Sequence, residues 1–303
     1  MRMKAQSKWS WEVAAYLFLA GLGGGAYVAG VTGDFLGAGW EVPSKVGVFL
    51  GFPSVFIGCM FLIADLGSPK NFWRAAMRPG TSWIARGTII ITIFMILDAI
   101  HIGFWVWPFP GVLANVDGAR HFLGILGIIF AFATMIYTGI LLGAARPIAF
   151  WSTAMLPLLF LVSALSTGVM AVVLVSSILG AAHEGPIAGL TRLDVMLIIL
   201  EIFVVGFYLQ ATHRVPESRA SALLVMTGAV APMFWLGFAF LGLLLPLVLE
   251  LIGAFALTGA GAGIAAVIAA ISGIVGGLIL RQVVLLGGIQ APLKAGRFEF
   301  ALP

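Results

Sequence analysis

Long apolar segments alternate with short polar ones along the whole chain. Eight of the apolar segments hold about 20 residues or more, which is the length that an α-helix needs to cross the hydrocarbon core of a membrane. They lie at residues 11–34, 46–66, 83–106, 120–144, 153–181, 193–212, 220–249 and 262–287. A chain in lipid must satisfy its backbone hydrogen bonds internally, so we predict that all eight are helices.

The composition supports this interpretation. The chain is 61% hydrophobic and only 9% charged, whereas soluble domains carry about 25% charged residues. We therefore predict an all-α polytopic membrane protein, with residues 1–303 forming one integral domain in the lipid bilayer. The net charge is only +4 and no soluble basic region stands out, so we do not expect a nucleic-acid partner.

Basic residues gather on one side of the predicted helices. The side that holds both termini has 13 of the 16 lysines and arginines, and the other side has Lys45, Arg120 and Arg192. The positive-inside rule then predicts that both termini lie in the cytoplasm. Basic loops can also form a docking surface for an acidic partner, and this alternative stays open.

The turn between the second and third segments combines acidic, basic and aromatic residues. Asp65 ends the second segment, and Lys70, Trp73, Arg74 and Arg78 follow within a short loop. Placing charged groups at a bilayer costs free energy, so residues of this kind usually have a function. We expect the four loop residues to contribute to partner docking.

Several polar residues are expected on the side of the termini, near the ends of different helices. Glu12 and Tyr16 are one turn apart on the same face of the first helix, and Asp65, Tyr137 and Arg281 approach the same side. A quinone head group needs hydrogen-bond donors at its carbonyls and a protonatable group nearby. This set is therefore a candidate quinone site. Each member also has an ordinary explanation, because tyrosine is common at membrane interfaces and Asp65 can pair with a nearby arginine, either Arg74 or Arg86.

Two further pairs of ionisable residues lie within predicted spans. Asp194 and Glu201 share one face of the sixth helix, with Glu201 about 10 Å deeper. They are candidates for proton transfer or for structural hydrogen bonds to the fifth helix, at Ser163, Ser166 or Thr167. Asp98 and His101 lie near the far end of the third helix, and His121 begins the fourth. They can line a proton exit or a second polar pocket, although a solvated helix end is the commoner situation.

The chain has few residues that could bind a redox cofactor. The single cysteine, Cys59, cannot hold a cluster, and no pair among the four histidines is placed to bind a haem between helices. No two histidines have the spacing of zinc ligands on one helix. We expect no haem, no iron–sulfur cluster and no metal on this chain, so any such centre would belong to a partner.

Several stretches together resemble one known family, the NrfD-like membrane subunits, which include the membrane anchor of polysulfide reductase. The matching stretches are WEVAAYLFLAGLGGG at 11–25, the DLG, FW and SW..RG run within 62–87, YTGILLGAARPIAFWSTAMLPLLFLVSALSTG at 137–168, DVMLIILEIFVVGFYL at 194–209, and the segment around Arg281. The resemblance covers nearly the whole chain. The combination of motifs is specific, although each motif alone would be weak.

The resemblance implies more than the composition does. It implies two four-helix bundles, which here correspond to residues 11–145, with the quinone site, and residues 151–288. It implies electron exchange between a quinone, with menaquinone expected, and a ferredoxin-like iron–sulfur subunit that usually serves a molybdopterin catalytic subunit. Family members hold no redox cofactor of their own. Many work with exported partners, which would place the docking face outside the cytoplasm.

The resemblance also assigns roles to residues. The quinone-site positions correspond to Tyr16, Asp65 and Tyr137, whereas Asp194, Glu201 and Arg281 match positions important for activity, in proton movement or structure. Some relatives have histidine or asparagine early in the first span, where this chain has Glu12.

We therefore predict a quinone-reactive subunit of a respiratory oxidoreductase in a bacterial or archaeal cytoplasmic membrane. On this chain alone there is no complete active site for the second substrate. Two alternatives remain, namely an ion- or solute-translocating subunit without redox chemistry and a plain structural anchor.

Overall fold

The structure is a computed structural model that describes residues 9–65, 69–77, 79–106, 117–144, 148–181, 185–213, 215–290, 293–295 and 298–300. Within these residues, eight helices are long and apolar enough to cross a membrane. The prediction of an all-α polytopic membrane protein is confirmed. The eight are α1 Trp11–Leu36, α2 Glu41–Ala64, α3 Trp83–Val106, α5 Asp117–Gly143, α6 Met155–Ile178, α7 Pro186–Thr212, the continuous pair η2 Met233–Leu244 and α9 Leu245–Phe255, and α10 Ala260–Leu286.

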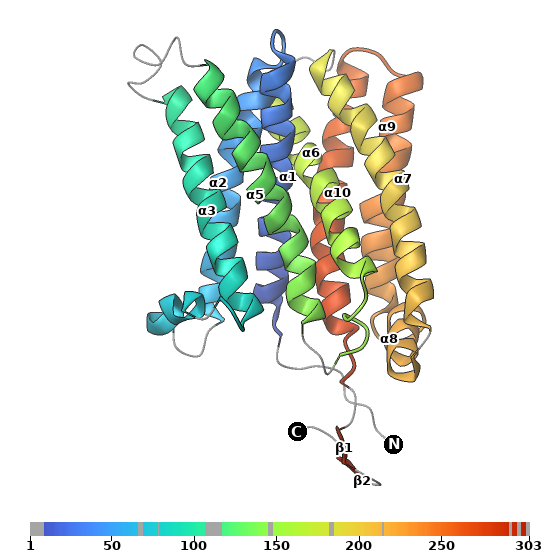
Figure 1. Ribbon diagram of the computed structural model, residues 1–303. Helices are drawn as coiled ribbons and strands as arrows, with labels where there is room; N and C mark the ends of the chain where they lie inside the picture. The colour runs from blue at the N-terminus through green and yellow to red at the C-terminus, as the bar shows by residue number, and fades with distance from the viewer. Residues whose placement is uncertain are drawn as a thin grey trace.

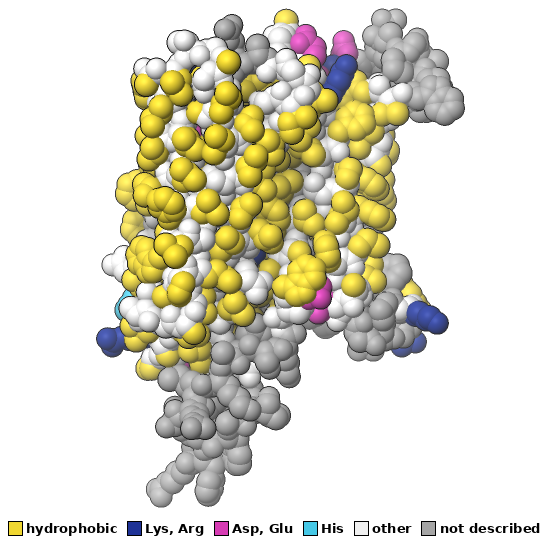
Figure 2. Space-filling model, turned by 180° about the vertical axis from the view of Figure 1, so that it is seen from behind, with side chains coloured by type: hydrophobic (Ala, Val, Ile, Leu, Met, Phe, Trp, Pro, Cys, Tyr) yellow, Lys and Arg dark blue, Asp and Glu magenta, His cyan; other side chains and the backbone are white. Residues whose placement is uncertain are grey.

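The spanning helices run side by side, and smaller elements lie beyond them at one end (Figure 1). These are the 3-10 helix η1 Pro69–Ala76, the short helix α8 Pro216–Met226, and an antiparallel hairpin of β1 Leu293–Ala295 with β2 Phe298–Phe300. The start of α1 and the last described strand, β2, lie at this end, which we call the terminus end; the opposite end is the far end. Hydrophobic side chains dominate the middle of the surface drawn in Figure 2, and most of the charged side chains visible there lie near its two ends.

The seventh span differs from its prediction. The sequence analysis placed it at residues 220–249, but the chain instead forms α8, turns, and then starts η2 after Pro232. The turn is closed by the Gly228 amide, which donates to the Leu223 carbonyl. Apolar residues continue through both elements, so hydropathy alone could not reveal the break. As a result the span extends to Phe255 and includes Glu250.

Helix α1 is the most buried span and lies at the centre of the fold. It packs on α2 and α5 on one side and on α6 and α10 on the other. It approaches α6 closely, because a β-carbon on Gly25 would overlap the Ala164 carbonyl and one on Gly168 would overlap the backbone of Gly25. Small residues that permit such approaches are typical of helix contacts in membranes.

The helices form two groups of neighbours. Helices α1, α2, α3 and α5 contact one another in the N-terminal half, and α6, α7, α9 and α10 do so in the C-terminal half. The two groups are not separate, since α6 packs on α1, α2 and α5 as well. The division into bundles at 11–145 and 151–288 therefore stays a prediction.

Candidate functional site

Two tyrosines from different helices lie near each other in the N-terminal group. Tyr16 of α1 and Tyr137 of α5 are only 1% and 4% exposed. Each lies within electrostatic range of Cys59 of α2, and the Tyr137 phenol is also within range of Tyr16. The structure thus brings together two residues that were predicted from widely separated stretches of the chain. We call Tyr16, Cys59 and Tyr137 the tyrosine site.

A glycine of α3 leaves the space that the Tyr137 ring occupies. A β-carbon on Gly87 would lie within the ring of Tyr137, so only glycine leaves room for it. Gly87 belongs to the SW..RG motif at the start of α3. The motif therefore has a physical role, because it sets the position of a phenol on the neighbouring helix.

Asp65 and Glu12 lie closer to the terminus end than the tyrosine site. Asp65 is exposed at the end of α2 and accepts a hydrogen bond from the Ser10 hydroxyl at 2.7 Å. It stands six residues beyond Cys59, or about 9 Å along the helix. Glu12 is half-buried, and its Oε2 atom is buried without a hydrogen-bond partner among the described residues. The two carboxylates thus lie between the tyrosine site and the water at this end.

Asp65 does not form the ion pair with Arg74 or Arg86 that the sequence analysis gave as an alternative. Arg86 instead donates to the carbonyl oxygens of Pro79 at 2.8 Å and Gly80 at 3.0 Å. The guanidinium of Arg74 lies 5.6 Å from the ring centre of Trp73. Within the described part of the chain, no salt bridge to Asp65 is formed.

The position of Arg281 differs from the one predicted for it. The sequence analysis placed its guanidinium at the membrane interface with the phenols, but its side chain is fully buried between α6 and α10. It donates to the Ser163 hydroxyl and to the Phe160 carbonyl, and it lies over the Phe160 ring. Because it sits inside a span, it also does not belong to the loop charges counted by the positive-inside rule.

Three carboxyl groups gather within the C-terminal group of helices. Asp194 and Glu201 of α7 are 1% and 3% exposed. Asp194 lies beside Ser166 of α6 and Glu250 of α9, whereas Glu201 lies beside Ser163 and within range of Arg281. We call Asp194, Glu201 and Glu250 the carboxyl cluster. The predicted proximity to serines of the fifth span is found, and it is compatible with both the structural and the proton-transfer role.

Glu250 was missed by the sequence analysis. It is 3% exposed and faces Asp194 across the α7–α9 contact. The signal was available, since a carboxylate inside a span is a functional candidate by default. It was overlooked because the predicted seventh span ended one residue too early.

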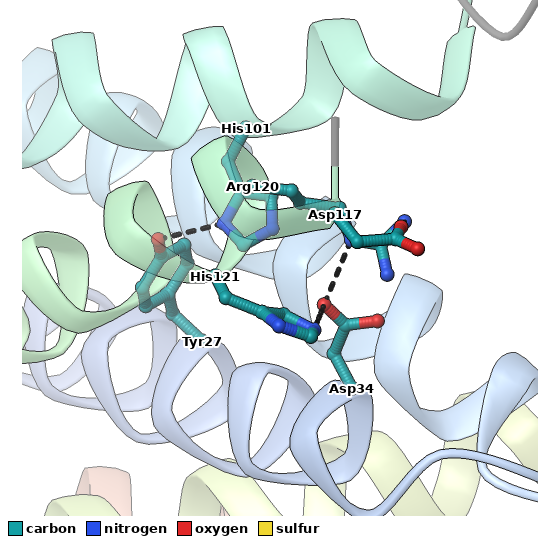
Figure 3. Close-up of polar contacts among 6 residues, drawn as sticks. All are labelled: Tyr27, Asp34, His101, Asp117, Arg120 and His121. Atoms are coloured by element: carbon teal, nitrogen blue, oxygen red, sulfur yellow. Dashed lines mark hydrogen bonds and ion pairs between the residues drawn. The ribbon is translucent and has the colours of Figure 1, made fainter. Parts of the chain in front are cut away.

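A third polar group lies toward the far end, between α1, α3 and α5 (Figure 3). The hydroxyl of Tyr27 is 2.9 Å from Nδ1 of His101, and both side chains are fully buried. Asp98 is also 0% exposed. The sequence analysis gave a solvated helix end as the commoner situation for such residues. For Asp98 and His101 that interpretation is wrong, because both are fully buried. Only His121 remains partly exposed at the rim, 3.6 Å from the Asp34 carboxylate.

The predicted docking loop is exposed at the terminus end. Within η1, Lys70 and Arg74 are exposed and Trp73 is 50% exposed, while Met77 just beyond it is 60% exposed. Arg78 lies outside the described residues. Exposed large apolar side chains beside basic ones, next to the membrane, are suited to binding another protein.

Eight apolar helices with buried tyrosines and carboxyl groups define this chain as a multi-pass membrane protein. Its sequence matches the family described as polysulphide reductase, NrfD, over residues 1–292. The chain therefore belongs to the NrfD family, as the resemblance had indicated.

Individual relatives agree with this assignment. The protein is 31% identical over 265 residues to the C chain of polysulfide reductase from Wolinella succinogenes, an alignment that spans 80% of this sequence and 82% of that one. It is 25% identical over 306 residues to protein NrfD of Escherichia coli, spanning 92% and 94%. It is 24% identical over 296 residues to the C subunit of selenate reductase from Mesobacillus selenatarsenatis, spanning 82% and 68%.

Proposed function

We propose that this chain is the quinone-reactive membrane subunit of a respiratory oxidoreductase complex, with menaquinone as its quinone. The observation that carries the proposal is the proximity of two buried phenols, Tyr16 and Tyr137, toward the terminus end of a multi-pass protein of the NrfD family. Its relatives are named as subunits of polysulfide and selenate reductases, which supports a place in an oxidoreductase complex.

The tyrosine site supplies what a quinone head group needs. Reduction of a quinone takes up two electrons and two protons, and negative charge develops on its carbonyl oxygens. The phenols of Tyr16 and Tyr137 donate hydrogen bonds to these oxygens. Glu12 and Asp65, which lie nearer the water at the terminus end, orient a donor or exchange protons. Oxidation of a quinol uses the same groups in reverse.

The electrons pass directly to a partner. Since the chain has one cysteine, the iron–sulfur cluster belongs to a ferredoxin-like subunit that docks on Lys70, Trp73, Arg74 and Arg78, and a molybdopterin subunit completes the complex. The tyrosine site and this loop both lie toward the terminus end, so the electron path through protein is short. The basic residues of the loops, Arg281 excluded, favour a cytoplasmic location for this end in a bacterium or archaeon; an exported partner would favour the outside.

A second candidate function is favoured by the carboxyl cluster. Three buried carboxyl groups, of which Glu201 lies within range of the buried Arg281, are the kind of group that moves protons or ions through a membrane protein. A subunit that translocates ions or solutes without redox chemistry would also contain them. In the proposed complex, Asp194, Glu201 and Arg281 serve proton transfer or hold the C-terminal helices together.

The proposal is tested by purifying the tagged complex in mild detergent and identifying by mass spectrometry the proteins that accompany it. We expect an iron–sulfur protein and a molybdopterin enzyme, with a cluster signal that changes when a quinol is added. The double variant Trp73→Ala, Arg74→Glu should lose most of the iron–sulfur partner, because it removes an exposed anchor and reverses a charge. Phe122→Ala, which removes another exposed aromatic side chain at the far end, is the control. A protein that purifies without a redox partner would favour the translocation function.

The fit of Gly87 against the Tyr137 ring gives a second prediction. Gly87→Ala is expected to displace the phenol and to reduce quinone turnover about tenfold or more, because a small misplacement of a positioned group costs about that much or more. Gly103→Ala on the same helix is the matched control, since a β-carbon there meets open space. Turnover and the amount of assembled complex should be measured together. Equal turnover in the two variants would mean that the position of Tyr137 does not matter.

A further inference from the structure

The buried polar residues at the far end have no part in the quinone site described above. Tyr27, His101 and Asp98 are all fully buried, and Tyr27 contacts His101 at 2.9 Å (Figure 3). Nε2 of His101 has no hydrogen-bond partner among the described residues. A buried imidazole with one committed nitrogen and one available nitrogen can accept a proton on one side and donate one on the other.

A rim of charged residues lies between this group and the far face. Asp34 binds Arg120 at 2.9 Å and lies 3.6 Å from His121, and Arg120 also contacts the exposed Asp117. The Asp34 and Arg120 side chains are 12% and 23% exposed. Figure 3 draws this rim beside His101 and Tyr27. The rim residues Asp34, Arg120 and His121 thus lie near the buried histidine, on the side of the far face.

The Asp98 carboxyl is buried against the backbone of a neighbouring helix. Its carboxyl lies against the α2 backbone at Gly51, where a β-carbon would overlap it, and the same position borders Tyr27. Neither carboxyl oxygen makes a hydrogen bond of good geometry among the described residues, although the Phe52 backbone of α2 lies close to the carboxyl. Burying a carboxylate with so little compensation is costly, and glycine at position 51 is what makes room for it. No ion pair to Asp98 is formed within the described residues.

Buried hydroxyl groups continue from this level toward the tyrosine site. Tyr27 is eleven residues from Tyr16, or about 16 Å along α1. Between these levels, Ser54 of α2 lies beside Gly23, and Thr134 of α5 follows Ala131, whose carbonyl faces Gly24. The Thr134 hydroxyl is buried and has no hydrogen-bond partner among the described residues. Protonatable or hydroxyl groups thus occur at successive depths of the N-terminal helices.

We propose that Asp34, His101, Tyr27 and Asp98 form a proton relay between the far face and the quinone. The inference rests on the proposed quinone reaction and adds its sidedness. Electrons are exchanged at the terminus end, where Glu12 and Asp65 then orient the hydrogen-bond donors, whereas protons are exchanged with the opposite face. The turnover of the complex then moves charge across the membrane.

Each step of the relay makes and breaks only N–H and O–H bonds. During quinone reduction, His101 accepts a proton at Nε2 from the rim and gives its Nδ1 proton to Tyr27, whose own proton passes on toward Asp98 and the hydroxyls beyond. Two protons travel this way for the two electrons that the partner's cluster delivers, and the His101 imidazole must return to its Nδ1–H tautomer between the two transfers. The charged groups near the relay are Asp34 on α1 and Asp117, Arg120 and His121 on α5, while Lys45 on α2 is exposed toward the far end.

The test uses the intact complex in membrane vesicles of known orientation, with impermeant pH dyes on either side. In Asp98→Asn and His101→Gln we expect turnover to fall about 100-fold and the far-face pH change to disappear, while the affinity for a quinone-analogue inhibitor stays within about twofold. Glu41→Gln, an exposed carboxylate at the far end, is the matched control and should behave as wild type. Two separate variants are used so that a folding defect in one of them does not decide the test.

The outcomes separate the relay from the quinone proposal. Wild-type turnover and a wild-type far-face pH change in both variants would overturn the relay, as would a pH change confined to the terminus-end face. Loss of inhibitor binding together with turnover would also overturn it, because the residues would then be structural. The quinone proposal is tested independently at Tyr16, whose loss leaves the far-end residues intact.

Discussion

Replacing Tyr16 by phenylalanine is expected to lower quinone turnover by about 100-fold or more while leaving the complex assembled. The change removes the hydroxyl that donates to the quinone carbonyl and keeps the buried ring that packs α1 against its neighbours. Loss of a positioned proton donor typically costs about 10²–10⁴ in rate. Asp65→Asn should act in the same direction, because it removes a group that exchanges protons or orients a donor. The measurement is steady-state quinone turnover by the purified complex.

The chain offers a matched control for this substitution. Tyr208 of α7 is 2% exposed and donates a hydrogen bond to the Phe150 carbonyl, away from the tyrosine site. Tyr208→Phe should cost about 1 kcal/mol of stability and leave turnover unchanged. Wild-type turnover in Tyr16→Phe would defeat the assignment of the quinone site.

Replacing Arg281 by leucine is expected to destabilise the protein more than any of the other single changes proposed above. It removes a buried cation that donates to Ser163 and leaves Glu201 buried without its opposite charge. Breaking such a buried arrangement from one side costs about 3–5 kcal/mol. The thermal unfolding midpoint of the detergent-solubilised protein should fall accordingly, and the yield of assembled protein should fall with it.

A double variant distinguishes the electrostatic cause from lost packing. Adding Glu201→Gln to Arg281→Leu removes the unpaired charge and should recover part of the lost stability. Arg219→Leu, at an exposed position of α8, should change stability by less than about 0.5 kcal/mol. If the double variant were as unstable as the sum of the two single ones, the charge on Glu201 would not be what Arg281 stabilises.

The spans were predictable because lipid imposes one strong rule on sequence, namely a run of apolar residues long enough to cross the bilayer. The rule fails where two helices are joined without a polar interruption. Between Met226 and Met233 the chain turns through Gly228 and Pro232 while staying largely apolar. Hydropathy therefore placed the seventh span too early and left Glu250 outside it.

The site residues were predictable by type and by the end of the helix on which they lie. Their partners were not, because burial depends on the neighbouring helix. Asp98 was expected near solvent from its distance to the end of α3, but Gly51 on α2 leaves a space that takes its carboxyl. Tyr27 and His101 meet for a similar reason, since the Tyr27 hydroxyl lies where a β-carbon on Gly127 would be. Contacts of this kind are set by glycines on other helices.

Photoaffinity labelling with an azidoquinone tests the central claim most directly. The intact complex is labelled, digested and mapped by mass spectrometry, with excess unlabelled quinone as the competitor. The account predicts competable label on the segments of α1, α2 and α5 around Tyr16, Cys59 and Tyr137. Competable label confined to α7 and α9, beside Asp194 and Glu250, would contradict it and place the quinone in the C-terminal group of helices.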